Sequence, residues 1–196
     1  IADRAYRAEY EVQDGQASRA DTFCSTMGGA VRVAGDDCTT LSTPTLPFVV
    51  GFDGGAGDTG KLVADVRALR DRYDFAADTV EAIGDIVSTG EDLLREADPD
   101  AEPSDELVAE LGDLMNINHG LLSALGVSSR SLDTMVWAAR EAGAEGAKLT
   151  GAGGGGCIVA LDRTEETQTS LKYTPGCEDS FRAELATEGV RVEEDE

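Results

Sequence analysis

The sequence is poor in histidine, lysine and cysteine, and this scarcity argues against several kinds of site. Its 196 residues include one histidine, three lysines and four cysteines, with no CxxC pair. Zinc sites need clustered Cys and His ligands, so we expect no metal site in this chain. Scattered thiols of this kind are expected to be buried and reduced, as in a cytoplasmic protein. No run of 18 apolar residues occurs, so we expect no membrane-spanning helix.

Basic residues are also scarce against the acidic ones. The chain has 39 Asp and Glu against 16 Lys and Arg, a net charge of −23. Such a surface repels nucleic-acid phosphates and anionic lipids, so neither a nucleic acid nor a membrane is expected as a partner. The acids are interleaved with Leu, Val and Ile, which indicates a folded chain rather than an acidic tail. Molar salt shortens the Debye length to about 3 Å. The composition therefore predicts a halophilic cytoplasmic protein.

The hydrophobic spacing predicts an α+β layout, with helices packed on an antiparallel sheet. Residues 1–13 resemble the middle of an amphipathic helix without an initiating Met, so we expect the chain to belong to a longer protein. From Thr59 on, apolar residues recur every three or four positions, which predicts helices. Ser104 is the expected N-cap of one of them. The apolar stripes of the four expected helices cover residues 62–73, 80–94, 107–125 and 132–139.

Short apolar runs predict the strands. Strands are expected over residues 22–34 and 46–53, with loops at 14–21 and 35–45. Residues 147–162 predict a strand, a glycine loop and a second strand. A further helix is expected over 179–187 and a last strand over 190–192.

The segment KLTGAGGGGCIVAL, residues 148–161, is the strongest functional candidate. Five of the six residues from Gly151 to Gly156 are glycine. Glycines leave backbone N–H groups uncovered, and successive free N–H groups bind anions such as phosphate. The segment is neither a Walker A loop nor a GxGxxG turn that opens a helix, because an apolar strand follows it. A flexible hairpin is the alternative, but the flanking strands favour a fixed anion-binding loop.

Three further segments hold single candidates. In GQASRADTFCSTMGG, residues 15–29, Asp21 stands on an expected loop and is either a proton acceptor for a hydroxyl or an ordinary turn or cap residue. His119 is either a structural histidine or a base that needs a positioned partner, and Asn118 is expected in or near the core. In GDTGKLV, residues 57–63, Asp58 or Thr59 is the expected N-cap of a helix, and the alternative is that Lys61 in the first turn faces an anion.

Taken together, GAGGGGC, DTFCSTMGG and NHGLLSALGVS resemble the GHMP kinases in order and spacing, and among them the mevalonate kinases. The resemblance covers residues 1 to about 162. It implies the GHMP kinase fold, with residues 1–55 forming the tail of the N-terminal domain and 56–196 a ferredoxin-like C-terminal domain. It also implies ATP-dependent phosphorylation of mevalonate to 5-phosphomevalonate, a step of isoprenoid biosynthesis, in the cytoplasm.

The resemblance assigns roles to residues. Asp21 matches the catalytic acid that faces the mevalonate hydroxyl, and Ser18 and Thr59 match substrate-pocket positions. The phosphate and nucleotide loop is matched by Gly151, Ala152, Gly153, Gly154 and Gly155. Where the family often has glycine before the acid, this chain has Arg19 and Ala20, which leaves the path of that loop open.

The family's main nucleotide loop, of the type PxGLGSSA, is not found in this sequence. The groups that hold ATP and Mg²⁺ are therefore expected upstream of Ile1, in a missing N-terminal half, and the chain alone is expected to be inactive. A homodimer is compatible with the resemblance. Two alternatives remain open: another GHMP kinase, such as a phosphomevalonate kinase, or a non-catalytic module that binds an anion or a partner chain.

Overall fold

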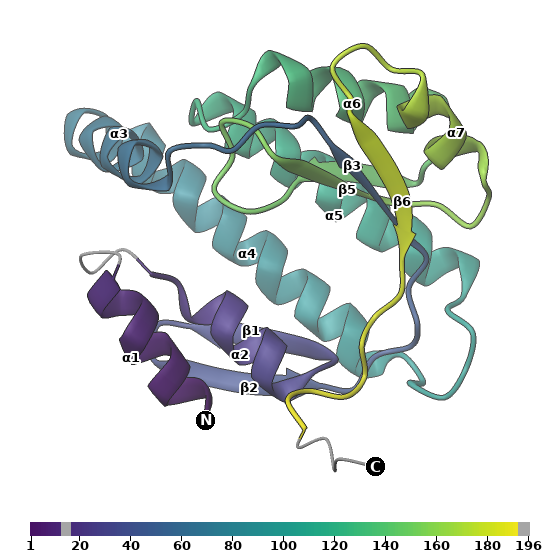
Figure 1. Ribbon diagram of the computed structural model, residues 1–196, viewed down its shortest axis with the longest axis horizontal. Coiled ribbons are helices and arrows are strands. Elements are labelled where there is room, and N and C mark those ends of the chain that lie inside the picture. The colour runs from purple at the N-terminus through teal and green to yellow at the C-terminus, as the bar shows by residue number, and fades with distance from the viewer. Residues whose placement is uncertain (13–16, 192–196) are drawn as a thin grey trace, which may run out of the picture. The chain divides into compact units, whose positions relative to one another are not determined.

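The computed structural model describes residues 1–12 and 17–191, and Figure 1 shows the order of its elements. The described residues form seven helices and six strands. The helices are α1 (Ala2–Val12), α2 (Arg19–Met27), α3 (Thr59–Arg72), α4 (Asp74–Glu96), α5 (Asp105–Ala124), α6 (Arg130–Glu141) and α7 (Glu166–Lys172). The strands are β1 (Ala30–Ala34), β2 (Asp37–Leu41), β3 (Phe48–Phe52), β4 (Gly146–Leu149), β5 (Cys157–Leu161) and β6 (Asp179–Ala183).

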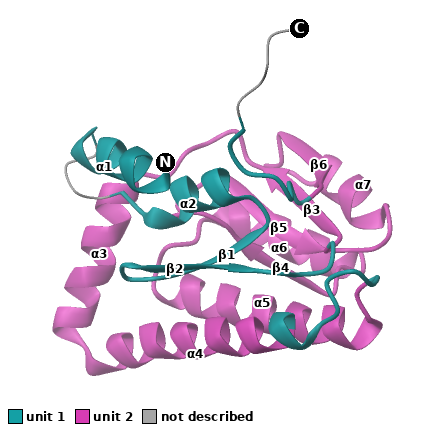
Figure 2. Cartoon of the chain, turned by 90° about the horizontal axis from the view of Figure 1, so that it is seen from below, with its two compact units in different colours: residues 1–45, 94–102, 185–196 teal, residues 46–93, 103–184 magenta. Residues whose placement is uncertain are grey.

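The chain divides into two compact units, drawn in different colours in Figure 2. Unit 1 contains residues 1–45, 94–102 and 185–196, and unit 2 contains residues 46–93 and 103–184. Strand β3 belongs to unit 2 because it pairs with β5 and β6. The assignment of residues 1–55 and 56–196 to two family domains stays a prediction.

Unit 1 is built from α1, α2 and the antiparallel hairpin β1–β2. Arg19 ties its elements together, because its guanidinium donates to Asp3 of α1 and to Asp36 of the hairpin turn, both at 3.0 Å. The same guanidinium lies over the ring of Tyr6, 4.3 Å from its centroid. Arg19, which departs from the family pattern, is therefore a structural residue of this unit.

Two expectations for unit 1 are wrong. Residues 19–27 were expected to be a loop and the start of a strand, but they form α2. The Ser18 hydroxyl caps this helix by accepting the Ala20 N–H at 3.1 Å, and Gly28 ends it with a φ of 71°. Residues 37–41, expected to be loop, form β2, which pairs along its whole length with β1. The expected strand is confirmed only over β1.

Unit 2 contains a four-stranded antiparallel sheet in the order β4-β5-β3-β6. Its core is formed by apolar side chains of the central strands and of α6, among them Val49, Ile158, Leu132 and Met135, all fully buried. The four long helices were expected from the apolar period and are confirmed as α3, α4, α5 and α6. The observed architecture confirms the α+β class.

Helix α5 covers the free edge of this sheet. Strand β4 is an edge strand, and an uncovered edge exposes unpaired backbone groups. The side chains of Asn116 and His119, one turn apart on α5, accept the N–H groups of Ala147 and Leu149 at 3.1 and 3.3 Å. The close approach requires glycine, because a Cβ at Gly146 would overlap the backbone of α5. The expected burial of Asn118 is confirmed.

The C-terminal elements differ from those expected. Residues 179–183 form β6, not a helix, because they pair with β3 in register, with Val50 opposite Phe181. Helix α7 was not expected. Of the expected last strand, residues 190 and 191 are not in a strand, and residue 192 lies outside the described residues.

The four cysteines are free thiols. Cys24 is exposed, and Cys38, Cys157 and Cys177 are half-buried, so the expectation that all four are buried is wrong. In the part of the chain that the structure describes, no helix is long and apolar enough to cross a membrane.

Candidate functional site

The glycine loop joins β4 to β5 and has a defined path. Gly153 and Gly154 have φ values of 88° and 74°, in the left-handed region that favours glycine. The Gly154 N–H donates to the carbonyl oxygen of Val127 at 2.8 Å. A Cβ at Gly153 would overlap the same carbonyl, and a Cβ at Gly57 would overlap the carbonyl of Gly153. The loop is therefore packed between the segment before α6 and the segment before α3.

Asp53 anchors the other end of the loop. This residue follows β3, and its Oδ1 accepts the N–H groups of Gly156 at 2.8 Å and Gly55 at 2.9 Å. Its Oδ2 accepts the hydroxyl of Ser131, in the first turn of α6, at 2.5 Å. Partial burial acts to raise the pKa of Asp53, but these hydrogen bonds outweigh it and hold the pKa below its ordinary value. Asp53 therefore works as a charged acceptor that fixes the loop.

The loop keeps several backbone donors unused. The N–H groups of Gly154 and Gly156 bind Val127 and Asp53 as described. Within the described residues, the N–H groups of Gly151, Ala152, Gly153 and Gly155 have no hydrogen-bond acceptor. A fixed loop with free N–H groups can bind an anion without losing further conformational entropy on binding.

The lone histidine is part of the support behind this loop. His119 is buried, and its Nδ1 accepts the N–H of Leu149, the last residue of β4. Nε2 therefore carries the hydrogen and lies 3.2 Å from Oδ1 of Asp133 in α6. Asp133 also accepts the hydroxyl of Ser128 at 2.5 Å. Both ring nitrogens are thus bonded within the protein, which favours the structural interpretation of His119.

Two pKa shifts accompany this support. Burial lowers the pKa of His119 and outweighs the opposite effect of Asp133; Lys148 and Arg140 lower it further. Burial also lowers the pKa of Lys148, whose ammonium donates to the Leu149 carbonyl at 2.8 Å. The hydrogen bond from the Leu149 N–H requires an unprotonated Nδ1, and a neutral imidazole provides it.

Asp21 lies in the first turn of α2 in unit 1, not on a loop as expected. Its side chain is exposed and, in the described part of the chain, forms no hydrogen bond or ion pair. The N-cap is Ser18, so the alternative that Asp21 is the capping residue is wrong. Asp21 is thus a free carboxylate, one helical turn from the Ser18 hydroxyl.

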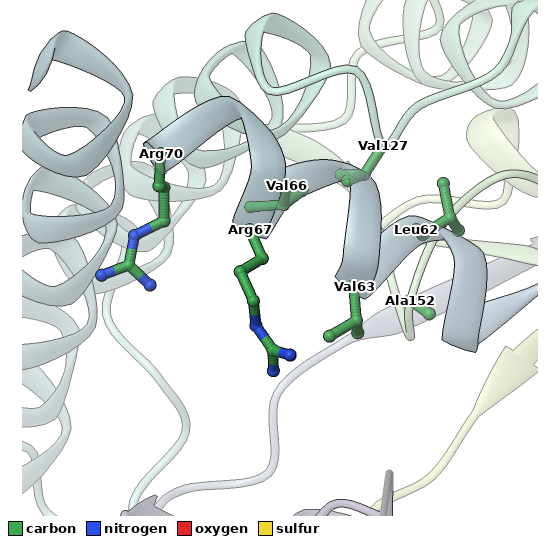
Figure 3. Close-up of a pocket in the computed structure, with 7 residues that line it drawn as sticks. All are labelled: Leu62, Val63, Val66, Arg67, Arg70, Val127 and Ala152. Atoms are coloured by element: carbon green, nitrogen blue, oxygen red, sulfur yellow. The ribbon is translucent and has the colours of Figure 1, made fainter. Parts of the chain in front are cut away.

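A pocket of about 270 Å³ opens beside the glycine loop in unit 2 (Figure 3). Helix α3 supplies most of its wall, and Ala152 brings the glycine loop to its edge. The expected cap of α3 is confirmed as Asp58, which accepts the Lys61 N–H at 3.0 Å. The residues that line the pocket are Leu62, Val63, Val66, Arg67, Arg70, Val127 and Ala152.

The structure brings some of the expected site residues together. Gly57, two residues before Thr59, packs against Gly153, so Thr59 and residues 151–155 belong to one part of unit 2. Ser18 and Asp21 belong to unit 1. Sequence reasoning missed Asp53 and Ser131; the only available signal was an acid placed directly between a buried strand and two glycines.

Comparison with known proteins gives a consistent result. Residues 104–173 match the family model described as GHMP kinases C terminal. The chain is 42% identical to a mevalonate kinase of Pyrococcus horikoshii over 196 residues, which cover 99% of this chain and 57% of that protein. It is 37% identical to a mevalonate kinase of Methanothermobacter thermautotrophicus, covering 96% of this chain and 59% of the relative.

Solved structures agree. The fold matches an L. major mevalonate kinase in complex with R-mevalonate, with a TM-score of 0.74 and 25% identity over 97% of this chain and 60% of that one. It also matches the Methanococcus jannaschii mevalonate kinase, with a TM-score of 0.72 and 25% identity over 95% of this chain and 55% of that one. The chain therefore spans a little over half the length of the relatives that it matches.

Proposed function

We propose that this chain belongs to the GHMP kinase family and forms the C-terminal part of a mevalonate kinase. The reaction would move the terminal phosphoryl group of ATP to the primary hydroxyl of mevalonate, giving 5-phosphomevalonate and ADP. The observation that carries the proposal is the glycine loop, which is fixed at both ends and keeps four N–H groups that bond to no described residue. The match to proteins named mevalonate kinase over 99% of the chain supports the choice of acceptor.

Phosphoryl transfer depends mainly on positioning and on stabilising charge. Gly151, Ala152, Gly153 and Gly155 supply backbone N–H dipoles for the charge that develops on the transferred group. These dipoles belong to the main chain. They can therefore stabilise a negative charge without a cationic side chain, although the molecule has a net charge of −23.

Asp21 would accept the proton of the mevalonate hydroxyl while the hydroxyl oxygen forms its bond to the phosphorus of the transferred group. The absence of a partner for this carboxylate in the described part of the chain leaves it free for substrate. Ser18 accepts a hydrogen bond as the cap and keeps its own proton to donate to substrate. Thr59, exposed at the start of α3, is the second substrate-binding candidate.

Mg²⁺ would neutralise phosphate charge in such a reaction. Among the described residues, no group of three His, Cys, Asp or Glu side chains is placed to hold a metal ion. We propose that the metal-binding groups and the main nucleotide loop belong to the part of the relatives' length that this chain does not span. A halophilic cytoplasm remains our proposal for its setting, on the basis of the net charge.

The proposal is tested by substrate choice in the intact protein. ADP release should depend on mevalonate, and phosphomevalonate should not replace it; the reverse result would indicate a phosphomevalonate kinase. Asp21→Asn should lower kcat by about 10²- to 10⁴-fold and change KM less. Glu11→Gln, at another exposed acid of unit 1, is the matched control and should leave kcat unchanged. Wild-type turnover in Asp21→Asn would remove Asp21 from the mechanism.

A further inference from the structure

Helix α3 is a basic segment in an acidic protein. Residues 61–72 carry four of the 16 basic residues and only two acids, whereas the rest of the chain carries 37 acids and 12 bases. Most of the surface therefore repels anions, and α3 is an exception. A small anion that approaches this protein is attracted to this helix more than to its surroundings.

Two arginines of α3 line the pocket and have no partner among the residues that the structure describes. Arg67 and Arg70 are one turn apart, and Figure 3 shows both side chains leaving the same side of the helix as Val63. Neither guanidinium forms a hydrogen bond or an ion pair with any described residue, although the chain holds 39 acids. By contrast, Arg19 bonds Asp3 and Asp36. The pocket thus contains two guanidinium groups whose donors are free for a ligand.

The rest of the pocket is apolar and reaches the glycine loop. Leu62, Val63, Val66 and Val127 supply aliphatic walls, and Ala152 belongs to the loop itself. The volume of about 270 Å³ lies just below the range of roughly 300–1,000 Å³ for small-molecule sites, which suits a metabolite of a few carbon atoms better than a nucleotide. A matching ligand has a short hydrocarbon body, an anionic group for the arginines and a reacting group near the loop.

We propose that Arg67 and Arg70 bind the carboxylate of the acceptor substrate, a small hydroxy acid, and so select for it. This inference rests on the proposed kinase function and deepens it. Guanidinium groups bind carboxylates through paired, charge-assisted hydrogen bonds. The aliphatic middle of mevalonate lies against the valines, and its primary hydroxyl lies toward Ala152 and the glycine loop.

The test uses the intact protein at one fixed KCl concentration. Arg67→Gln and Arg70→Gln should each raise the KM for mevalonate about tenfold, which is the usual worth of one charge-assisted hydrogen bond, with a smaller effect on kcat. Arg67→Lys and Arg70→Lys keep the charge and should recover part of the loss. Arg72→Gln is the matched control, because Arg72 lies on α3 outside the pocket with its guanidinium 5.9 Å from the Tyr73 ring centroid.

A neutral substrate analogue sharpens the result. The triol in which the carboxylate of mevalonate is replaced by a CH₂OH group should be a poor substrate of the wild-type protein. The double variant Arg67→Gln/Arg70→Gln should lose most of this discrimination, since it no longer recognises the carboxylate. Unchanged KM and unchanged discrimination in the double variant, with a normal unfolding midpoint, would overturn the inference.

The two proposals fail in different ways. If the wild-type protein does not phosphorylate mevalonate, the proposed function is wrong, and the carboxylate assignment is wrong with it. If the wild-type protein is active and the arginine variants behave like Arg72→Gln, only the carboxylate assignment is wrong. Should a Gln variant unfold, the Lys variant of the same position supplies the comparison: it should raise the KM for mevalonate by less than about tenfold, and a KM equal to that of Arg72→Gln would count against the inference.

Discussion

Alanine at Gly153 should destabilise the protein much more than alanine at Gly151, although both glycines have positive φ values, 88° and 76°. A left-handed backbone costs an L-residue about 1–2 kcal/mol, and this cost is common to both variants. The surroundings differ. A Cβ at Gly151 would meet nothing within 4 Å, whereas a Cβ at Gly153 would overlap the carbonyl oxygen of Val127.

The additional cost at Gly153 follows from that overlap. The Val127 carbonyl must move, and it is also the acceptor for the Gly154 N–H at 2.8 Å. Loss of this hydrogen bond costs about 1 kcal/mol, and the forced backbone shift about 1–3 kcal/mol more. We therefore expect Gly151→Ala to lower the free energy of unfolding by about 1–2 kcal/mol and Gly153→Ala by about 3–6 kcal/mol.

Urea unfolding of the intact protein at fixed KCl measures both values. The two variants share the side chain, the loop and the sign of φ, so their difference isolates the contact with Val127. Equal losses in the two variants would show that the loop does not pack on Val127, and the description of a fixed loop would then be wrong. Far-ultraviolet circular dichroism of each variant confirms that the folded states are comparable.

Three further outcomes are expected. Asp53→Ala removes the acceptor for Gly55, Gly156 and Ser131 and should lower the free energy of unfolding by about 3 kcal/mol, whereas Asp53→Asn, which keeps one oxygen, should cost less. The pKa of His119 is lowered in the folded state, so the free energy of unfolding of the wild type should fall as the pH drops through about 6.5. Asn at this position does not titrate. The difference in free energy of unfolding between wild type and His119→Asn should therefore change as the pH drops through about 6.5 and stay constant above it. With a net charge of −23, the unfolding midpoint should rise between about 0.1 M KCl and the molar range, and a flat profile would contradict the halophilic proposal.

The helices were predictable because several local signals coincide in them. Ser104 and Asp58 stand before apolar stripes of helical period, and both are observed as N-caps. The glycine loop was predictable for a similar reason. The apolar strand-like segments on both sides indicate that the glycines form the connection between two strands. Local sequence determines such features, so a reading of local patterns can find them.

The errors fall where distant residues decide the structure. Residues 179–183 carry no strong strand pattern, and they form β6 because β3 offers them an open edge. The side chain of Gln168 in α7 then donates to the Ser180 carbonyl at 3.2 Å, and the Ser180 hydroxyl donates back to the Gln168 carbonyl at 3.1 Å. The spacing of apolar residues does not predict either interaction. In this segment tertiary pairing overrides local propensity.

The start of α2 shows the opposite case, because the sequence there contains a local signal for a helix. Ser18 followed by Asp21 is a capping residue with an acid in the first turn, a pattern that favours a helix start. The β-branched and aromatic residues after it suggested a strand instead. The observed helix ends at Gly28, where a left-handed glycine is a common helix stop.

The support of the glycine loop could not be inferred from spacing, because it is made almost entirely of long-range contacts. Asp53 reaches Gly156 across 103 positions and Ser131 across 78. These bonds meet at one point, since the carboxylate joins the end of β3, the end of the loop and the first turn of α6. A rigid attachment at this point keeps the unbonded N–H groups of the loop in place before any anion arrives. Preorganised dipoles stabilise charge best when they need not move during the reaction. In the proposed function, the residues that bind the phosphate can therefore be simple glycines, and a carboxylate that need not touch the substrate fixes their placement.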